Sequence, residues 1–397
     1  MNPLLDRLQP YPFEKLRALF AGTAPADQAA IRLSIGEPQH ATPELVFKAL
    51  QEGFSGLAQY PSTNGSDALR NTIARWLERR YGLPAIDAGS QVLPVNGSRE
   101  ALFSFAQAVL DPSRPAPLVA CPNPFYQIYE GAAFLAGAQP VFLNQTQANG
   151  FGFDLDSLGA DEWARVQLLY VCSPGNPTGR VLSLDEWREL FALSDRYGFT
   201  IASDECYSEL YFDEARPTLG ALQAAQQLGR EGFPRLVVFS SLSKRSNVPG
   251  LRSGFVAGDA ALLKKFLLYR TYHGCAMSPM VQVASIAAWS DEAHVLENRR
   301  QYAAKFASAT PALQQALDVD LPDASFYLWA RTPISDTEFA RRLYAEENVT
   351  VLPGSYLARE AHGENPGAKR VRIALVANQA ECDEGIARIV RFVRWLG

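Results

Sequence analysis

Seven short runs of mainly apolar residues recur along the first two thirds of the chain. They cover residues 91–95, 117–120, 140–143, 167–172, 200–203, 236–240 and 254–257. Most are continuously apolar rather than alternating, which is typical of strands that are covered on both faces. Stretches with helical periodicity separate them, and one of these begins with the capping box of Ser183 and Glu186. The pattern predicts an α/β fold whose mainly parallel seven-stranded sheet is sandwiched by helices.

The pattern changes after residue 290. A long polar helix is expected over 292–306, followed by the strand-like FYLWA, the helical SDTEFARRLYAEE, the strands VTVL and RVRIAL, and a closing helix. This order predicts a smaller α+β domain. The first forty residues show no strong strand and are expected to pack on this domain or on a neighbouring subunit. We therefore predict a large domain over 45–290, and a small domain made of 291–397 with the N-terminal arm 1–44.

Composition and charge narrow the class of protein. Of the 397 residues, 47% are hydrophobic and 20% are charged, as in a folded globular chain. The net charge of −5 provides no basic field for a nucleic acid, and we expect neither a secretory signal nor a membrane span. The five cysteines and four histidines lack metal-ligand or disulfide spacing, so no metal site is expected and a reducing cytoplasm is the simplest location.

Polar and aromatic residues follow five of the predicted strands. In open parallel sheets, ligands bind beyond the carboxyl ends of the strands. The residues at these ends are Gly97–Arg99, Tyr126, Asn176, Asp204–Tyr207 and Lys244. Taken singly, several have ordinary structural explanations: Gly97 and Asp204 as parts of helix N-caps, Asn176 as a turn residue and Tyr126 as a core residue. Their convergence on one edge of the sheet favours a ligand site.

The stretch SSLSKRSNVPGLRSGF indicates the chemistry of that site. A lysine near other cations or in a partly desolvated pocket has a lowered pKa, and it can form a Schiff base with an aldehyde. Around Lys244, the hydroxyls of Ser241 and Ser243 and the guanidinium of Arg252 are suited to a phosphate. Asp204, on a neighbouring strand end, requires a cationic partner or a strong donor if it is buried. Together these groups match the aldehyde, phosphate and ring nitrogen of pyridoxal 5'-phosphate.

The chain resembles the class I/II aminotransferases among the fold-type I pyridoxal phosphate enzymes. The resemblance covers nearly the whole chain, from about Ile35 to Phe392. The motifs that carry it are IGEP, YPSTNGSDALR, NGSREAL, NPFYQIY, SPGNPTG, DECYSEL, SLSKRSNVPGLRSGF and RVRIAL. For catalysis, the resemblance implies that Lys244 forms the Schiff base and later moves the proton. It also implies that Asp204 pairs with the pyridine nitrogen, and that Tyr207 and Asn176 bind the phenolic oxygen of the cofactor.

The resemblance also implies how the cofactor and substrate are held. Tyr126 would stack on the ring, and Arg372 would bind the substrate α-carboxylate beside the backbone of Gly36. Tyr60 would reach the phosphate in the other subunit, which implies a homodimer with shared active sites. The phosphate would be surrounded by Ser98, Arg99, Ser241, Ser243 and Arg252. The implied partners are amino acids and 2-oxo acids.

Two segments resemble those of succinyldiaminopimelate aminotransferases of lysine biosynthesis: RSNVPG after Lys244, and VLPGSYLAREAHGENPGAKRVRIALV. The resemblance implies the substrate N-succinyl-L,L-2,6-diaminopimelate, with Arg359, Arg17 and Arg245 as candidates for its distal groups. An aspartate, aromatic or acetylornithine-type aminotransferase and a C–S lyase remain alternatives, because each would retain the same cofactor apparatus. A regulator with a DNA-binding module is disfavoured, since residues 1–40 are too short and too weakly basic for one.

Overall fold

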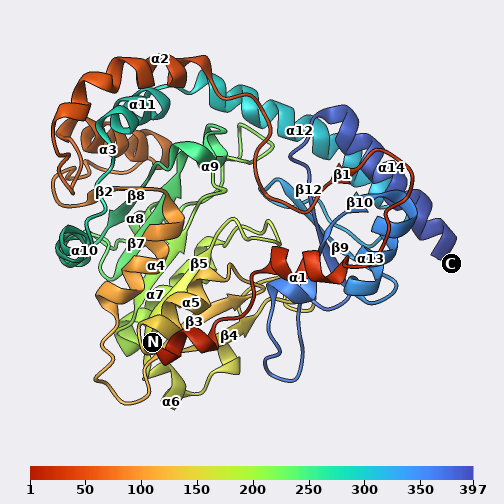
Figure 1. The fold of residues 1–397 in the computed structure, drawn as a ribbon. Helices are drawn as coiled ribbons and strands as arrows, with labels where there is room; N and C mark the ends of the chain where they lie inside the picture. The colour runs from red at the N-terminus through yellow and green to blue at the C-terminus, as the bar shows by residue number, and fades with distance from the viewer. Residues whose placement is uncertain (397) are drawn as a thin grey trace.

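The computed structural model describes residues 1–396 and places helices on both faces of a central seven-stranded sheet (Figure 1). The strand order is β2-β8-β7-β6-β5-β3-β4, and β8 alone runs in the direction opposite to that of the other six strands. The strands are β2 (Val92–Val95), β3 (Leu118–Asn123), β4 (Gln139–Asn144), β5 (Val166–Cys172), β6 (Thr200–Asp204), β7 (Leu236–Ser241) and β8 (Gly254–Gly258). The predicted fold class is confirmed.

The strands of the large sheet contribute to a separate hydrophobic core on each face. In β5, Leu168 and Tyr170 belong to one core, and Leu169 and Val171 belong to the other. All seven residues of β5 are buried, which explains why the strand reads as a continuous apolar run. One face is covered by α4 (Ser98–Val109), α5 (Ile128–Leu135) and α10 (Ala260–His273). The other is covered by α2 (Glu44–Glu52), α3 (Asp67–Tyr81), α6 (Ala160–Trp163), α7 (Leu184–Tyr197), α8 (Ala221–Gln227) and α11 (Pro279–Ser290).

A smaller unit with its own core follows the large sheet. It contains the antiparallel sheet β11-β12-β9 and the parallel pair β1-β10. Its elements are β1 (Ile31–Arg32), α12 (Ala293–Leu313), β9 (Tyr327–Arg331), α13 (Asp336–Glu347), β10 (Val349–Thr350), β11 (Leu352–Pro353), β12 (Arg370–Ala374) and α14 (Gln379–Leu396). The domain boundaries at residues 45 and 290 stay a prediction.

Three details differ from the sequence-based expectation. The first forty residues do contain a strand, but β1 is two residues long and leaves no periodic pattern. The expected strand VTVL is divided at Val351, because β10 pairs with β1 whereas β11 pairs with β12. The helix expected over 292–306 is α12, which continues to Leu313 and contains Pro311 in its last turn.

The N-terminal arm contacts both units. The short 3₁₀ helix η1 (Pro3–Arg7) packs on α5, and Arg7 lies over the ring of Phe134 at 4.3 Å. Helix α1 (Pro12–Leu19) then packs on β11 and on η5 (Gly354–Leu357) of the smaller unit. The 3₁₀ helices η2 (Gly53–Ala58), η3 (Leu155–Ser157) and η4 (Pro249–Leu251) lie in connections. Within residues 1–396, no helix is both long and apolar enough to cross a membrane.

A buried ion network fastens α12 to the large unit. Glu209 accepts from Arg80 of α3 at 2.7 Å and pairs with Arg299 of α12 at 3.4 Å. Arg299 also pairs with Glu214 at 2.6 Å. Because Glu209 and both arginines are almost fully buried, the network is costly to break at any one member.

We predict that Glu209→Leu lowers the free energy of unfolding by about 3–5 kcal/mol, since Arg80 would keep a buried charge without its carboxylate. Equilibrium unfolding in urea measures the change. Asp185→Ala is the control, because the Asp185–Arg188 pair is exposed and should contribute less than about 1 kcal/mol. An equal effect of the two substitutions would contradict the prediction.

Candidate active site

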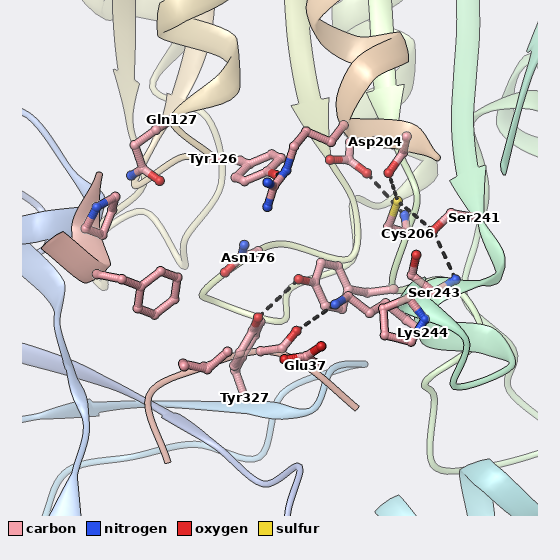
Figure 2. Close-up of a pocket in the computed structure, with 18 of the residues that line it drawn as sticks. Glu37, Tyr126, Gln127, Asn176, Asp204, Cys206, Ser241, Ser243, Lys244 and Tyr327 are labelled. Atoms are coloured by element: carbon pink, nitrogen blue, oxygen red, sulfur yellow. Dashed lines mark hydrogen bonds between the residues drawn. The ribbon is translucent and has the colours of Figure 1, made fainter. Parts of the chain in front are cut away.

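A cavity of about 680 Å³ lies between the strand ends of the large sheet and strands β9 and β12 of the smaller unit (Figure 2). It is lined by all the predicted cofactor and substrate residues except Tyr60. These are Gly36, Ser98, Arg99, Tyr126, Asn176, Asp204, Tyr207, Ser241, Ser243, Lys244, Arg252 and Arg372. The convergence inferred from the strand ends is therefore present in the structure.

Lys244 lies in α9 (Leu242–Arg245), a four-residue helix that directly follows β7. Its Nζ donates to the carbonyl oxygen of Gly36 at 2.6 Å. Burial lowers the pKa of Lys244 to about 8, an effect that the nearby Arg372 guanidinium reinforces and Cys206 opposes. A larger fraction of this amine is consequently unprotonated near neutral pH than in an ordinary lysine, which suits a nucleophile or a proton acceptor.

Asp204 ends β6 and is 5% exposed. Its Oδ2 accepts from the hydroxyl of Tyr129 at 2.8 Å, and its Oδ1 accepts from the backbone N–H of Cys206 at 3.3 Å. Burial raises the pKa of the carboxyl group, although these hydrogen bonds oppose the rise. A turn rather than a helix follows Asp204, so the N-cap explanation is wrong. A buried carboxylate facing the cavity is suited to a ring N–H that carries positive charge.

A candidate anion site lies where α4 begins. Gly97 has φ +86°, and a Cβ there would lie 2.2 Å from Nη2 of Arg252. The Gly97 backbone and the Arg252 guanidinium approach so closely that only glycine fits at position 97. The guanidinium therefore lies beside the free N–H groups at the N-terminus of α4. Ser98, Ser241 and Ser243 add hydroxyl groups to the cavity lining. Gly97 is the N-cap of α4, as the sequence predicts, and the structure adds its contact with Arg252.

Arg99 extends away from the helix terminus. Its Nε donates to the hydroxyl of Tyr126 at 2.6 Å, and its guanidinium lies 6.0 Å from the ring centre of Tyr11 on the N-terminal arm. The side chain is exposed and forms no ion pair with any acid in residues 1–396. Its backbone can therefore serve the anion site while its guanidinium faces another part of the cavity.

Arg372 is fixed on β12 with 4% of its surface exposed. It donates to Oδ1 of Asn176 at 3.0 Å and to the carbonyl of Ser34 at 2.9 Å, and it stacks 4.2 Å over the ring of Tyr327. Its Nε is buried without a hydrogen-bond partner in the described part of the chain. This half-satisfied guanidinium at the cavity is suited to a carboxylate.

Several functional neighbours are absent from the sequence-based interpretation. Tyr327 hydrogen-bonds the hydroxyl of Tyr207 at 3.2 Å, and a Cβ at Gly36 would lie 1.7 Å from its oxygen. Tyr129 binds Asp204, and the thiol of Cys206 donates to Ser98 at 3.0 Å. Tyr327 lies inside an apolar strand and gives no separate signal. Tyr129 and Cys206 lie inside motifs that were already recognised.

Four of the residues singled out from the sequence lie outside the cavity lining. Tyr60 is fully exposed on the surface. Of the three arginines considered for the distal groups, Arg359 pairs with Glu130 at 2.6 Å, and the buried Arg245 pairs with Glu292 at 2.7 Å. Arg17 is exposed on α1. The structure therefore does not bring these three arginines to the site.

Comparison with known proteins identifies the family. The sequence profile "Aminotransferase class I and II" matches residues 28–389. The chain belongs to the class I and II aminotransferases. An LL-diaminopimelate aminotransferase from Nitratidesulfovibrio vulgaris is 31% identical to this aminotransferase over 98% of this chain and 97% of the relative.

Solved structures agree with this assignment. An aminotransferase from Neisseria meningitidis is 55% identical, with a TM-score of 0.96 over 99% of this chain and 100% of that one. A probable N-succinyldiaminopimelate aminotransferase from Thermus thermophilus is 27% identical, with a TM-score of 0.83 over 96% and 98% of the two chains. The predicted family is confirmed, and its cofactor is pyridoxal phosphate. The cavity of this aminotransferase fits that group, since it offers an amine of lowered pKa, a buried carboxylate and the anion site at Gly97 and Arg252.

We predict that Gly97→Ala raises the dissociation constant of pyridoxal phosphate about tenfold or more, because the new methyl group would displace the Arg252 guanidinium from the anion site. Fluorescence or absorbance titration of the apoenzyme with the cofactor measures the change. Gly82→Ala is the matched control: Gly82 also has a positive φ, but a Cβ added there would meet no atom within 4 Å. Equal cofactor affinity in the two variants would contradict the assignment of the anion site.

Proposed function

We propose that this aminotransferase exchanges the amino group of N-succinyl-L,L-2,6-diaminopimelate with 2-oxoglutarate in a ping-pong cycle, in the bacterial synthesis of lysine. The observation that carries the proposal is the presence of two separate guanidinium groups, Arg372 and Arg99, at different places in one cavity. A substrate with carboxylates at both ends requires such a pair. The diaminopimelate named in the relatives' activities, and the segments after Lys244 that resemble succinyldiaminopimelate aminotransferases, support this substrate class.

The cofactor, when bound, supplies an aldehyde for the substrate amine and a ring that withdraws electrons from the bond to Cα. In the proposed roles, Arg372 binds the α-carboxylate and orients the Cα–H bond toward Lys244. Lys244 Nζ, with its lowered pKa, takes the proton from Cα. Asp204 keeps a proton on the ring nitrogen through charge pairing, while Tyr207 and Asn176 donate to the phenolic oxygen. This positioning supplies a large share of the rate enhancement.

The distal half of the substrate is proposed to lie toward the N-terminal arm. Tyr11 and Phe13 line this side of the cavity, together with Leu352 and Leu357 of the smaller unit. These side chains suit the methylene chain of a long substrate, and the Arg99 guanidinium beside Tyr11 suits a carboxylate. Because Arg99 has no acidic partner in residues 1–396, no ion pair must break when substrate binds.

We also propose that the enzyme is a homodimer. Phe47, Phe54, Leu57 and Tyr60 are exposed along α2, η2 and the segment that follows. These elements pack firmly on α11, so their outward apolar side chains form a rigid surface that a second copy can cover. Tyr60 of the partner subunit would then complete the phosphate site.

The five cysteines are free thiols, which supports a cytoplasmic location.

We predict that kcat/KM for N-succinyl-L,L-2,6-diaminopimelate with 2-oxoglutarate exceeds that for any unsuccinylated donor by about tenfold or more. A coupled assay of glutamate formation should compare it with LL-diaminopimelate, N-acetylornithine, aspartate and tyrosine. Lys244→Ala is the inactive control. A preference for LL-diaminopimelate or an ordinary amino acid would contradict the substrate assignment, and release of pyruvate from a thioether amino acid without any acceptor would favour a C–S lyase.

We predict that Arg99→Leu raises KM for the succinylated substrate about 10-fold to 100-fold, because a charged hydrogen bond to the distal carboxylate is lost. KM for alanine, which has no second carboxylate, should change little. Arg17→Leu is the matched control, since Arg17 is an exposed arginine outside the cavity lining. A parallel rise of KM for both substrates would instead indicate damage to the cofactor site.

A further inference from the structure

One lysine outside the cavity is buried without a carboxylate partner in the described part of the chain. Lys305 of α12 is 2% exposed, and no acid within residues 1–396 forms an ion pair with it. Its Nζ lies 2.6 Å from Nε2 of His40 and donates to the carbonyl of Leu375 at 3.3 Å. Burial lowers the pKa of Lys305 to about 8. An ammonium without a carboxylate partner is expensive to bury, so its retention calls for an explanation beyond stability.

The hydrogen bonds around His40 have one consistent direction. Asn298 uses its Nδ2 to donate to the carbonyls of Lys244 at 3.2 Å and Arg245 at 3.4 Å. Its Oδ1 is therefore the acceptor that faces Nδ1 of His40 at 2.7 Å, and Nδ1 must carry the hydrogen. In the neutral imidazole, Nε2 is then free to accept from Lys305. The order of donation is Lys305 to His40, His40 to Asn298, and Asn298 to Lys244.

We call the hydrogen-bonded chain of Lys305, His40 and Asn298 the relay. It contacts three segments that carry active-site residues. Helix α9 is so short that the carbonyls of Lys244 and Arg245 lack intrahelical partners, and Asn298 supplies one. His40 lies four residues after Gly36, whose carbonyl accepts from the Lys244 amine. Leu375 lies three residues after Arg372 on the chain that leaves β12. Lys305 thus connects the backbones that carry the amine, its acceptor and the carboxylate-binding guanidinium.

We propose that Lys305, His40 and Asn298 are positioning residues that set the distance between the Lys244 amine and the substrate held by Arg372. The inference rests on the proposed roles of Lys244 and Arg372. None of the three residues lines the cavity, so they act through the backbones that they bind. A displacement of about 1 Å at the reacting atoms can lower the rate about 100-fold. Accurate positioning of these atoms can therefore outweigh the stability that is lost by burying the unpaired charge of Lys305.

The test replaces both polar partners together. Lys305→Met/His40→Phe leaves neither half of the Lys305–His40 hydrogen bond buried alone, and the new phenyl ring keeps the aromatic contact with Tyr302, whose ring lies 4.4 Å from that of His40. Tyr302→Phe is the matched control on the same helix, because its hydroxyl is buried without a partner in the described chain. Each purified holoenzyme is assayed for kcat, KM, melting temperature and the pH midpoint of its visible absorbance, which reports the proton on the Lys244 nitrogen.

The double variant is expected to melt within a few degrees of the wild type, to lose about tenfold or more in kcat with a smaller change in KM, and to shift the absorbance midpoint. Tyr302→Phe should change none of these. Asn298→Ala should reproduce the loss, and adding it to the double variant should cost little more, because the three residues act in one chain. Additive losses, or a double variant that matches Tyr302→Phe, would overturn the proposal. A large fall in melting temperature with an unshifted midpoint would also overturn it, as that would show a purely structural role.

Failure of the relay is distinguishable from failure of the proposed active site. If Lys244 does not bind the cofactor, the wild type and Lys244→Ala will show the same absorbance titration. If only the relay is wrong, the wild type will still differ from Lys244→Ala, but the double variant will titrate like the wild type.

Discussion

The hydrogen bond between the Lys244 amine and the carbonyl of Gly36 joins the large sheet to the smaller unit in the wall of the cavity. Lys244 follows β7 of the large sheet, whereas Gly36 follows β1, which pairs with β10 of the smaller unit. The Lys244 side chain is half-buried in this arrangement, and burial is the main cause of its lowered pKa. The reactive group therefore depends on how two separately packed cores meet.

The cavity has an electrostatic character opposite to that of the whole chain. The net charge is −5, yet Arg99, Lys244, Arg252 and Arg372 all line one space. The acids there are fewer, and Glu100 is already engaged by Arg270 at 2.8 Å. A cofactor with a phosphate and substrates with two or more carboxylates meet local positive potential inside a globally acidic molecule. Global composition could not reveal this, although the motifs at the strand ends could.

Much of the fold and site could be predicted because the relevant signals are local. Most strands of the large sheet are buried on both faces, so they are continuous apolar runs, and ligand residues follow the ends of several of them in the chain. The two-residue β1 and the division between β10 and β11 depend on pairing between distant segments. Tyr327 lies in an apolar strand, so its sequence context does not distinguish it from a core residue. Its place in the site becomes evident only from its contact with Gly36, which is distant in the sequence. The direction of Arg99 likewise depends on Tyr11 and Tyr126, which local sequence cannot specify.

The contact between Gly36 and Tyr327 has a consequence for how enzymes of this shape can diverge. Any side chain at position 36 would occupy the place of the tyrosine hydroxyl, so the two positions share one volume. A larger residue at position 36 fits only if a smaller residue has replaced Tyr327. Substitution at position 36 alone creates a steric clash, and substitution at position 327 alone leaves a cavity. We therefore expect these two positions to change together during divergence, and reshaping of the substrate pocket to begin elsewhere in its wall.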